Sequence, residues 1–191
     1  MSFLDRLAAA VTPAASQADR AQARNNIERL AKDEPWLESI VTQHKEIEQA
    51  FAEARNASGT EARRRAAEQV AILLTAHATA EEAVVYPAIA EMTGKTQATL
   101  AYEEHSMTKV QLAKLRDLDP MSGEWKEKLE HIEGAVQQHV YEEENGWLPD
   151  LAEKLPQQRK RILSERYADQ YTRYDKGVGA QRSPDMVYTS A

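Results

Sequence analysis

The sequence of 191 residues contains no cysteine. Disulfide bonds, zinc fingers and cysteine-held iron–sulfur clusters are therefore excluded, and any metal must be bound through nitrogen and oxygen atoms. No apolar run reaches the roughly 18–20 residues that span a bilayer, so we expect no transmembrane segment. Acidic residues outnumber basic residues, 31 to 24, and the net charge is −7. This argues against a nucleic-acid partner, because phosphate contacts need a basic surface.

Runs of β-branched residues are scarce, whereas alanine and glutamate are plentiful, and this composition predicts an all-α chain. The opening MSFLDRLAAAVTPAASQA lacks the basic start of a secretory signal, and Asp5 and Arg6 interrupt its apolar stretch. We interpret residues 1–34 as an N-terminal arm with an amphipathic piece and a polar helix over about 16–32. The expected compartment is the cytoplasm, and nothing in the sequence indicates the oligomeric state.

Proline and glycine divide the remainder of the chain into helices. A C-terminal helix is expected over residues 156–176, and residues 177–191 are expected to be a disordered tail. The intervening region, residues 35–155, is interpreted as one domain of four helices. Those helices are predicted over residues 35–56, 60–93, 96–118 and 123–154.

In each of the four helices, apolar residues recur in steps of three and four, as on the inward face of a helical bundle. A histidine interrupts this face in every helix. A lone histidine there is usually a core residue bonded to a polar neighbour. Four in matched register favour a shared role. The predicted inward positions are Leu37, Ile40, His44, Ile47 and Phe51; Val70, Leu74, His77, Glu81, Val84 and Ala88; Ala98, Ala101, His105, Thr108, Leu112 and Leu115; and Leu129, Ile132, Val136, His139, Glu143 and Trp147.

The spacing of these histidines indicates two copies of one helical hairpin. His44 precedes His77 by 33 residues, and His105 precedes His139 by 34. Each copy has a single histidine on its first helix and His-x-x-x-Glu on its second, ending at Glu81 and Glu143. Two hairpins packed about a pseudo-twofold axis would therefore direct four imidazoles and two carboxylates into one volume.

Burial of two carboxylates that face each other destabilises the fold unless cations lie between them. Six such ligands suit two ions, each bound by two histidines, with both carboxylates and a solvent-derived oxygen bridging them. Imidazole and carboxylate with vacant positions suit iron best, with manganese or zinc as other options. Two neighbouring acids, Glu82 and Glu144, lie off the inward face and are expected to be solvated or to orient imidazole N–H groups.

The four motifs resemble those of the hemerythrin-like (HHE cation-binding) family, in the contexts HATAEEAVVYP, YEEHSMTK and HVYEEENGWLP. The resemblance covers about residues 35–155. It implies an up-down-up-down four-helix bundle around a non-haem di-iron centre. The metal ligands that it implies are His44, His77, Glu81, His105, His139 and Glu143.

The chain departs from oxygen-carrying members of that family, which have a fifth histidine one turn after the position of His105. Lys109 is found there, and it is expected to extend outward or to pair with an acid. At the related position after His44, Glu48 could be an additional ligand or an exposed residue. Tyr86, Tyr102 and Tyr141 could donate hydrogen bonds to the site or simply pack in the bundle.

Pro87 and Pro149 each follow a glutamate ligand by six residues. Each proline removes a backbone N–H, freeing the carbonyl groups of Ala83 and Asn145, and is expected to bend its helix. This would either shape the mouth of the site or simply end the helix near the edge of the bundle.

Three functions follow from these features. The first is a protein that binds oxygen or a related small oxidant at a di-iron site, for sensing, scavenging or storage. The second is an enzyme that decomposes hydrogen peroxide or oxidises ferrous iron at the same site. The third is a metal-free helical interaction module that uses the C-terminal helix and its QQRKR stretch. The missing fifth histidine argues against reversible oxygen transport.

Overall fold

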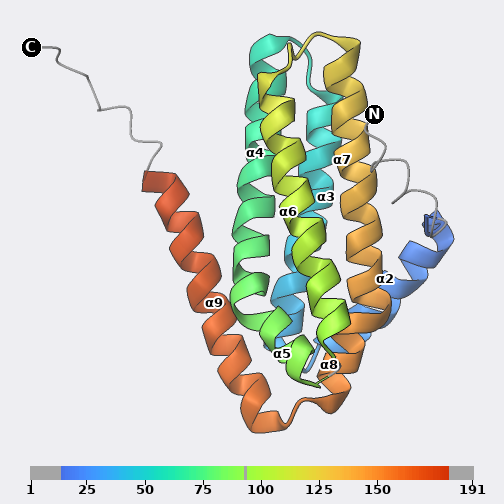
Figure 1. The fold of residues 1–191 in the computed structure, drawn as a ribbon, viewed down its shortest axis with the longest axis vertical. Helices are drawn as coiled ribbons and strands as arrows, with labels where there is room; N and C mark the ends of the chain where they lie inside the picture. Colours follow the sequence, from blue (N-terminus) through green and yellow to red (C-terminus); the bar gives the residue numbers. More distant parts are fainter. Residues whose placement is uncertain (1–13, 93, 181–191) are drawn as a thin grey trace, which may run out of the picture.

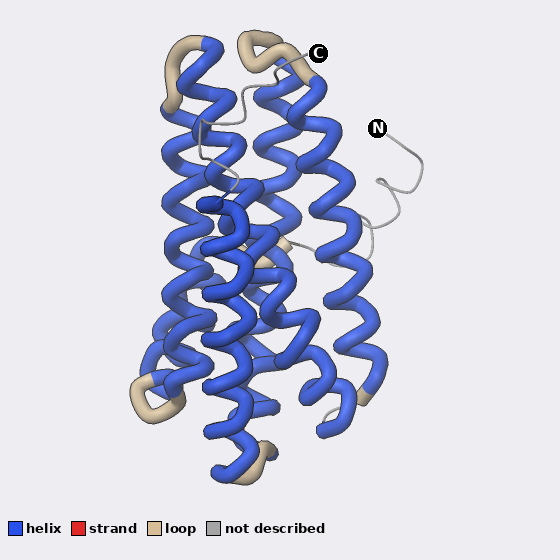
Figure 2. The backbone as a smooth tube through the Cα atoms, turned by 90° about the vertical axis from the view of Figure 1, so that its left-hand side faces the viewer, coloured by secondary structure: helices blue, strands red, loops and turns tan. Residues whose placement is uncertain are grey.

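The computed structural model describes residues 14–92 and 94–180, and helices are the only regular secondary structure in this part of the chain (Figures 1 and 2). Short loops join the helices at both ends of the molecule. The principal helices are α2 (Gln17–Ala31), α3 (Pro35–Asn56), α4 (Thr60–Ala80), α5 (Tyr86–Met92), α6 (Lys95–Asp117), α7 (Gly123–Glu142), α8 (Leu148–Lys154) and α9 (Gln157–Ala180).

The four long helices α3, α4, α6 and α7 lie side by side (Figure 1). The loops from α3 to α4 and from α6 to α7 lie at the same end of the bundle, and the chain returns through α5 at the other end. The observed starts follow local signals in the sequence. Pro35 is in the first turn of α3, and the Ser122 hydroxyl accepts a hydrogen bond from the backbone N–H of Trp125 at the start of α7.

Two of the expected long helices are interrupted by one π-helical turn each. These turns are η1 (Glu81–Val85) and η2 (Glu143–Trp147), so each begins at a predicted carboxylate ligand. The backbone N–H of Tyr86 bonds to the carbonyl of Glu81, five residues earlier, and that of Leu148 bonds to the carbonyl of Glu143. A π turn places an additional residue in the helix. The prolines therefore follow a change of helical register.

The π turns correct the predicted inward face beyond each glutamate. Val84, expected to point inward, is only partly buried, whereas Val85 and Tyr86 are fully buried. In the second copy, Leu148 is fully buried as well as Trp147. The predicted positions hold up to the ligand, and beyond it Ala88 and Trp147 are buried as predicted. The π turn adds the residue next to the predicted position to the buried face in each copy, Val85 in the first and Leu148 in the second.

The hydrophobic core consists of two clusters, and the histidines lie between them. One cluster contains Ile40 and Val41 of α3 with Tyr86 and Leu148, and extends to α2, α8 and α9. The other contains Ile47 of α3 and runs to the loops at the far end. His44, between these segments of α3, is completely buried.

Helices α2 and α9 pack against the outside of the four-helix arrangement. The α2 helix contacts α3, α7 and η2, while α9 contacts α3, α4 and η1. The α9 helix extends to Ala180 rather than ending at 176, and residues 177–180 are helical rather than part of a tail. Isolated glycines weaken a helix by about 1 kcal/mol without ending it, and the next proline is Pro184. Residues 181–191 and the amphipathic piece within residues 1–13 lie outside the described part of the chain.

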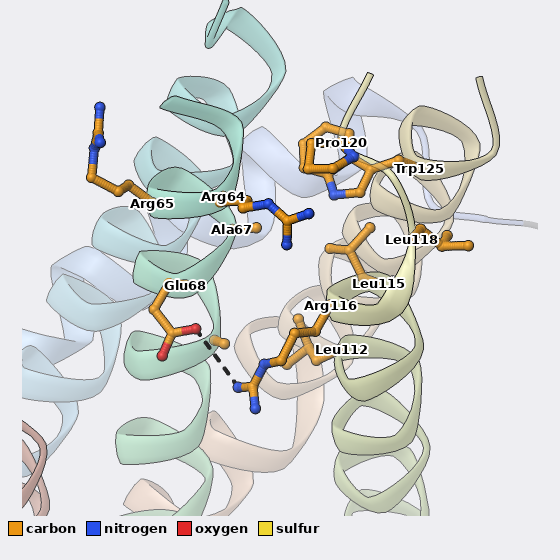
Figure 3. Close-up of a pocket in the computed structure, with 11 residues that line it drawn as sticks. Arg64, Arg65, Ala67, Glu68, Leu112, Leu115, Arg116, Leu118, Pro120 and Trp125 are labelled. Carbon is orange, nitrogen blue, oxygen red and sulfur yellow. Dashed lines mark ion pairs between the residues drawn. The ribbon is translucent and has the colours of Figure 1, made fainter. Parts of the chain in front are cut away.

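A groove of about 300 Å³ lies between α4 and the end of α6 (Figure 3). Its floor includes Leu115 and Trp125, and the Arg116 side chain forms an ion pair with Glu68 across it at 3.7 Å. None of the predicted ligands lines this groove. Among the described helices, none combines the length and the apolar character that crossing a bilayer requires.

Candidate metal centre

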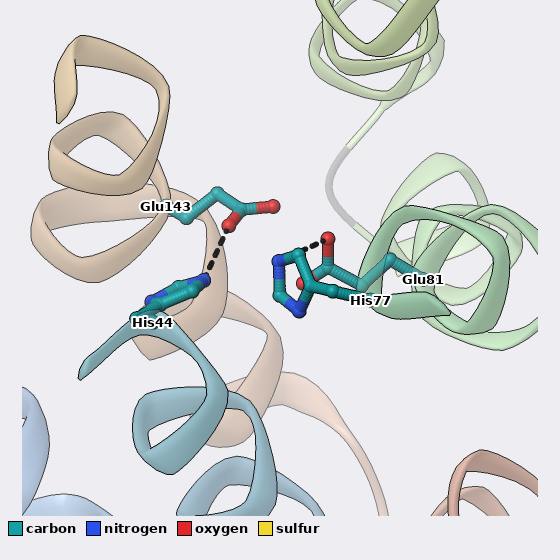
Figure 4. Close-up of side chains that lie close together, drawn as sticks. All are labelled: His44, His77, Glu81 and Glu143. Atoms are coloured by element: carbon teal, nitrogen blue, oxygen red, sulfur yellow. Dashed lines mark ion pairs between the residues drawn. The ribbon is translucent and has the colours of Figure 1, made fainter. Parts of the chain in front are cut away.

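The six predicted ligands meet inside the bundle. Ligand atoms of His44, His77, Glu81 and Glu143 lie within 4.8 Å of one another, and all four residues are buried (Figure 4). We call this group site one. A second group with the same mutual separation consists of Glu81, His105 and His139, and we call it site two. Because Glu81 belongs to both, the sites adjoin each other.

All four imidazoles have the same orientation. Each directs Nε2 toward the cluster, while Nδ1 is hydrogen-bonded to a side chain outside it. An Nδ1–H group that donates to an outer oxygen leaves the Nε2 lone pair available to a metal. The outer contacts are His44 with Glu144 (2.8 Å), His77 with Oε1 of Gln43 (3.0 Å), His105 with Glu82 (3.1 Å) and His139 with Glu104 (2.7 Å).

Four buried atoms of site one lack a hydrogen-bond partner: Nε2 of His44, Nε2 of His77, Oε1 of Glu81 and Oε2 of Glu143. The two glutamates lie close to the imidazoles, with 3.2 Å from His44 Nε2 to Glu143 Oε2 and 3.0 Å from His77 Nε2 to Glu81 Oε2. Polar atoms that have no hydrogen-bond partner in a dry interior lower the stability of the folded protein. A cation between them would satisfy all four, so the donor set fits a metal.

Without a metal, protons balance the charge of the carboxylates. Burial opposes protonation of His44, but Glu143 and Glu144 outweigh it and raise the pKa of His44 to about 10. Burial likewise opposes protonation of His139, whose pKa is nevertheless raised to about 9, mainly by the charge of Glu143 and the hydrogen bond with Glu104. Burial and the charge of His139 lower the pKa of His105. A metal at these sites must displace the protons on His44 and His139.

Tyr86 lies at the centre of the cluster rather than beside it. Its hydroxyl donates to Glu143 Oε1 (3.0 Å) and is 3.3 Å from Glu81 Oε2. It also lies 2.9 Å from Nε2 of His105 and 3.3 Å from Nε2 of His139. Burial and the two carboxylates raise the pKa of Tyr86 well above its ordinary value, so the phenol keeps its proton. The structure therefore places one O–H group among four candidate ligands.

The remaining sequence candidates lie outside the cluster. Glu48, considered as a ligand, has a half-exposed side chain and forms an ion pair with Arg24 (2.9 Å). Lys109 pairs with Glu82 at 2.7 Å. The Tyr102 hydroxyl donates to the backbone carbonyl of Glu82, and Tyr141 forms no hydrogen bond with the predicted ligands within the described residues. Of the additional positions proposed from sequence, Tyr86 alone contacts predicted ligands on their inner side, and it contacts four of the six.

Gln43 and Glu104 contact imidazoles and were not predicted from the sequence. Each immediately precedes a histidine of the first helix in its hairpin and contacts the histidine of the second. The polar residue before both His44 and His105 occurs at the same position of each hairpin, so the repeat itself indicated these two contacts. Two further contacts had no such signal: Nε of Arg24 in α2 donates to Glu144 at 2.8 Å, and the Tyr167 hydroxyl in α9 lies 3.4 Å from Nδ1 of His77. Both helices lie outside the repeat.

Comparison with known families matches residues 37–151 to the hemerythrin HHE cation binding domain. The chain belongs to this family. The buried His and Glu groups of this hemerythrin-family protein are therefore found in a domain whose members bind cations.

A DNA nickase of Nostoc sp. (strain PCC 7120) is 26% identical over 108 residues. The match covers 56% of this chain but only 31% of that protein, so the chain spans less than a third of this relative. No solved structure matches the chain significantly.

Proposed function

We propose that this protein holds two iron ions at sites one and two and binds oxygen or a related small oxidant for sensing, scavenging or storage. The observation that carries this proposal is the set of four buried, unsatisfied donor atoms facing one volume. We also infer that α3, α4, α6 and α7 form the up-down-up-down bundle expected for this family. Iron is preferred over manganese or zinc on the basis of its affinity for mixed imidazole and carboxylate ligands with vacant positions.

The candidate ligands would be shared between the two ions as follows. His44, His77, Glu81 and Glu143 would hold one ion, and His105 and His139 would hold the other together with Glu81. Iron when bound supplies electrons to a small oxidant. The protein contributes a dry, shaped cavity and a proton held on the hydroxyl oxygen of Tyr86.

The size of the adjoining cavity supports a small ligand. A cavity of about 20 Å³ lies against His77, His105 and His139, and its other lining residues are mostly apolar, including Leu74, Leu112 and Val136. A volume of about 10–15 Å³ is the least that holds one water molecule. The cavity therefore suits a diatomic molecule or peroxide and is too small for an organic substrate.

The test is anaerobic reconstitution with ferrous iron, followed by measurement of iron per chain and of the absorption spectrum before and after exposure to air. We expect two iron ions per chain and a new visible absorption in air. Only trace iron, with equal thermal stability of chelator-treated and iron-treated samples, would favour the metal-free interaction module instead.

An enzyme that decomposes hydrogen peroxide or oxidises ferrous iron at the same site is the second candidate. The Tyr86 hydroxyl favours it, because this group places a proton between Glu143 and the imidazoles of site two. Oxygen evolution from peroxide by iron-loaded protein tests it, with free iron at the same concentration as the control. Turnover no faster than that of free iron would leave the binding function alone.

The name of the Nostoc relative raises DNA as a partner. We propose that this chain does not act on DNA, because Glu81 and Glu143 are fully buried and a strand of DNA cannot reach donors inside the bundle. Incubation of iron-loaded protein with supercoiled plasmid tests this. Accumulation of nicked circles above the level given by free iron would contradict it.

A further inference from the structure

The outer partners of the imidazoles differ between the two sites. At site one, His44 and His77 contact Glu144 and Gln43, both of which are buried. At site two, His105 and His139 contact Glu82 and Glu104, whose side chains are 24% and 38% exposed. The sites thus have similar inner ligands but different surroundings.

Helix α2 supports the partner of His44. Nε of Arg24 donates to both carboxylate oxygens of Glu144 at 2.8 Å, and the same guanidinium reaches Glu48 at 2.9 Å. The Arg24 side chain is only 16% exposed. A guanidinium held by two carboxylates has a fixed geometry. It therefore fixes the Glu144 carboxylate, which in turn fixes the His44 ring.

Helix α9 supports the partner of His77 in an equivalent way. The Tyr167 hydroxyl donates to Oε1 of Gln43 at 2.6 Å, and this oxygen also lies 3.0 Å from Nδ1 of His77. Tyr167 is buried. With its oxygen bonded to both groups, the Gln43 amide cannot rotate to present its NH₂ group to His77. The hydroxyl thereby favours the tautomer of His77 in which Nδ1 carries the proton and donates to Gln43, which leaves the lone pair of Nε2 directed toward the cluster.

We propose that Arg24 and Tyr167, which lie outside the matched region 37–151, are positioning residues for the metal ion of site one. Through them α2 and α9 make this ion the more firmly held of the two. The ion of site two, whose outer partners are open to water, exchanges more readily. This inference rests on the proposed function, because it requires that both sites bind metal.

The test uses the full chain loaded anaerobically with ferrous iron and follows iron release to a ferrous chelator. Tyr167→Phe removes only the hydroxyl, and Arg24→Gln removes the guanidinium. Matched controls on the same helices are Ser164→Ala and Arg20→Gln, whose side chains bond to backbone carbonyls nearby. Loss of an outer partner typically weakens metal binding 10–100-fold. We expect Tyr167→Phe and Arg24→Gln each to accelerate release of half of the iron by about tenfold, and the controls to release iron like the wild type.

Glu104→Gln removes an outer partner at site two, so comparison with it identifies which half of the iron each variant releases faster. Combined with Tyr167→Phe it should accelerate release of both halves, whereas Tyr167→Phe combined with Arg24→Gln should accelerate one half alone. Arg24→Lys, which keeps the charge, should restore part of the retention. Tyr167→Phe keeps the buried ring, so it tests the inference even if Arg24→Gln fails to fold.

The two proposals fail differently. If the wild type binds no iron, the proposed function is wrong. If the wild type binds two ions but Tyr167→Phe and Arg24→Gln release them at wild-type rates, or accelerate the same half as Glu104→Gln, only the positioning role is overturned.

Discussion

The hydroxyl of Tyr86 donates a hydrogen bond to Oε1 of Glu143, 3.0 Å away and 57 residues later in the chain. This bond links the two copies of the hairpin repeat at their shared centre. The corresponding residue of the second copy, five residues after Glu143, is Leu148. The centre therefore has one phenol, on one side, despite the symmetry of its histidines.

Tyr86→Phe is expected to destabilise the metal-free protein. The change removes a donor from two buried carboxylates, and an unsatisfied buried group costs about 1–3 kcal/mol. Zinc, which has no redox chemistry, should reduce this loss of stability because the metal would bind the same two carboxylates through their other oxygens, Oε1 of Glu81 and Oε2 of Glu143. Chemical denaturation with and without zinc measures both effects. Tyr102→Phe is the control, since its hydroxyl bonds to a backbone carbonyl, and a loss that is equally large with zinc would contradict the expectation.

Glu81→Gln is expected to lower metal stoichiometry more than any change at Glu48. Glu81 belongs to both sites, whereas Glu48 is half-exposed and paired with Arg24. We expect one metal ion per chain or fewer in Glu81→Gln and two in Glu48→Gln. Metal analysis after gel filtration measures this. Two ions in both variants would show that Glu81 does not bridge the sites.

Metal-induced stabilisation is expected to increase with pH. The pKa values of about 10 for His44 and about 9 for His139 in the folded, metal-free chain exceed the ordinary value of about 6.5. Their contribution to stability is thus complete below about pH 6.5 and is lost as pH rises toward 9–10. Zinc must displace these protons, so the shift in Tm on adding zinc should grow from pH 6 to pH 8. Proton release on binding, followed with an indicator dye, is the second measurement, and its absence would contradict the protonated state.

At low pH the carboxylates determine stability. Burial opposes ionisation of Glu144, but the bonds from His44 and Arg24 lower its pKa below the ordinary value. A lowered carboxyl pKa contributes stability that is present above about pH 4.5 and lost as pH falls further. In Glu144→Gln, the stability of the metal-free protein should therefore fall less steeply as the pH drops below 4.5. Acid titration followed by circular dichroism compares it with Glu142→Gln, and parallel curves would contradict a role for Glu144.

Two glycines are expected to respond oppositely to alanine. Gly134 lies within α7, and a Cβ there meets no atom within 4 Å, so Gly134→Ala should stabilise the chain by about 0.5–1 kcal/mol. Gly59 precedes α4 with φ of 82° and ψ of 153°, a conformation that costs other residues about 1–3 kcal/mol. Thermal unfolding of both variants with a chelator present tests the opposite signs, and a stabilised Gly59→Ala would contradict the backbone argument.

Much of the candidate site was predictable because its information is local. Prolines and glycines mark most helix ends, and the hairpin spacing selects the histidines and the two glutamates. The i, i+4 step predicts that His77 and Glu81 share a face, and they do lie 3.0 Å apart. The expectation for Val84 was met only in part: Val84 packs against the core but is less buried than Val85, because the π turn interrupts the α-helix that the expectation assumed.

The sequence by itself determined the all-helical class, the approximate helix ends and the candidate metal ligands, because residue spacing and helix periodicity govern all three. Tertiary structure alone decided the position of Tyr86 and the contacts that Arg24 and Tyr167 make with Glu144 and Gln43. A π turn depends on what the helix packs against, and contacts between residues 90 or more positions apart depend on how α2 and α9 dock. Neither is encoded in the local spacing of residues.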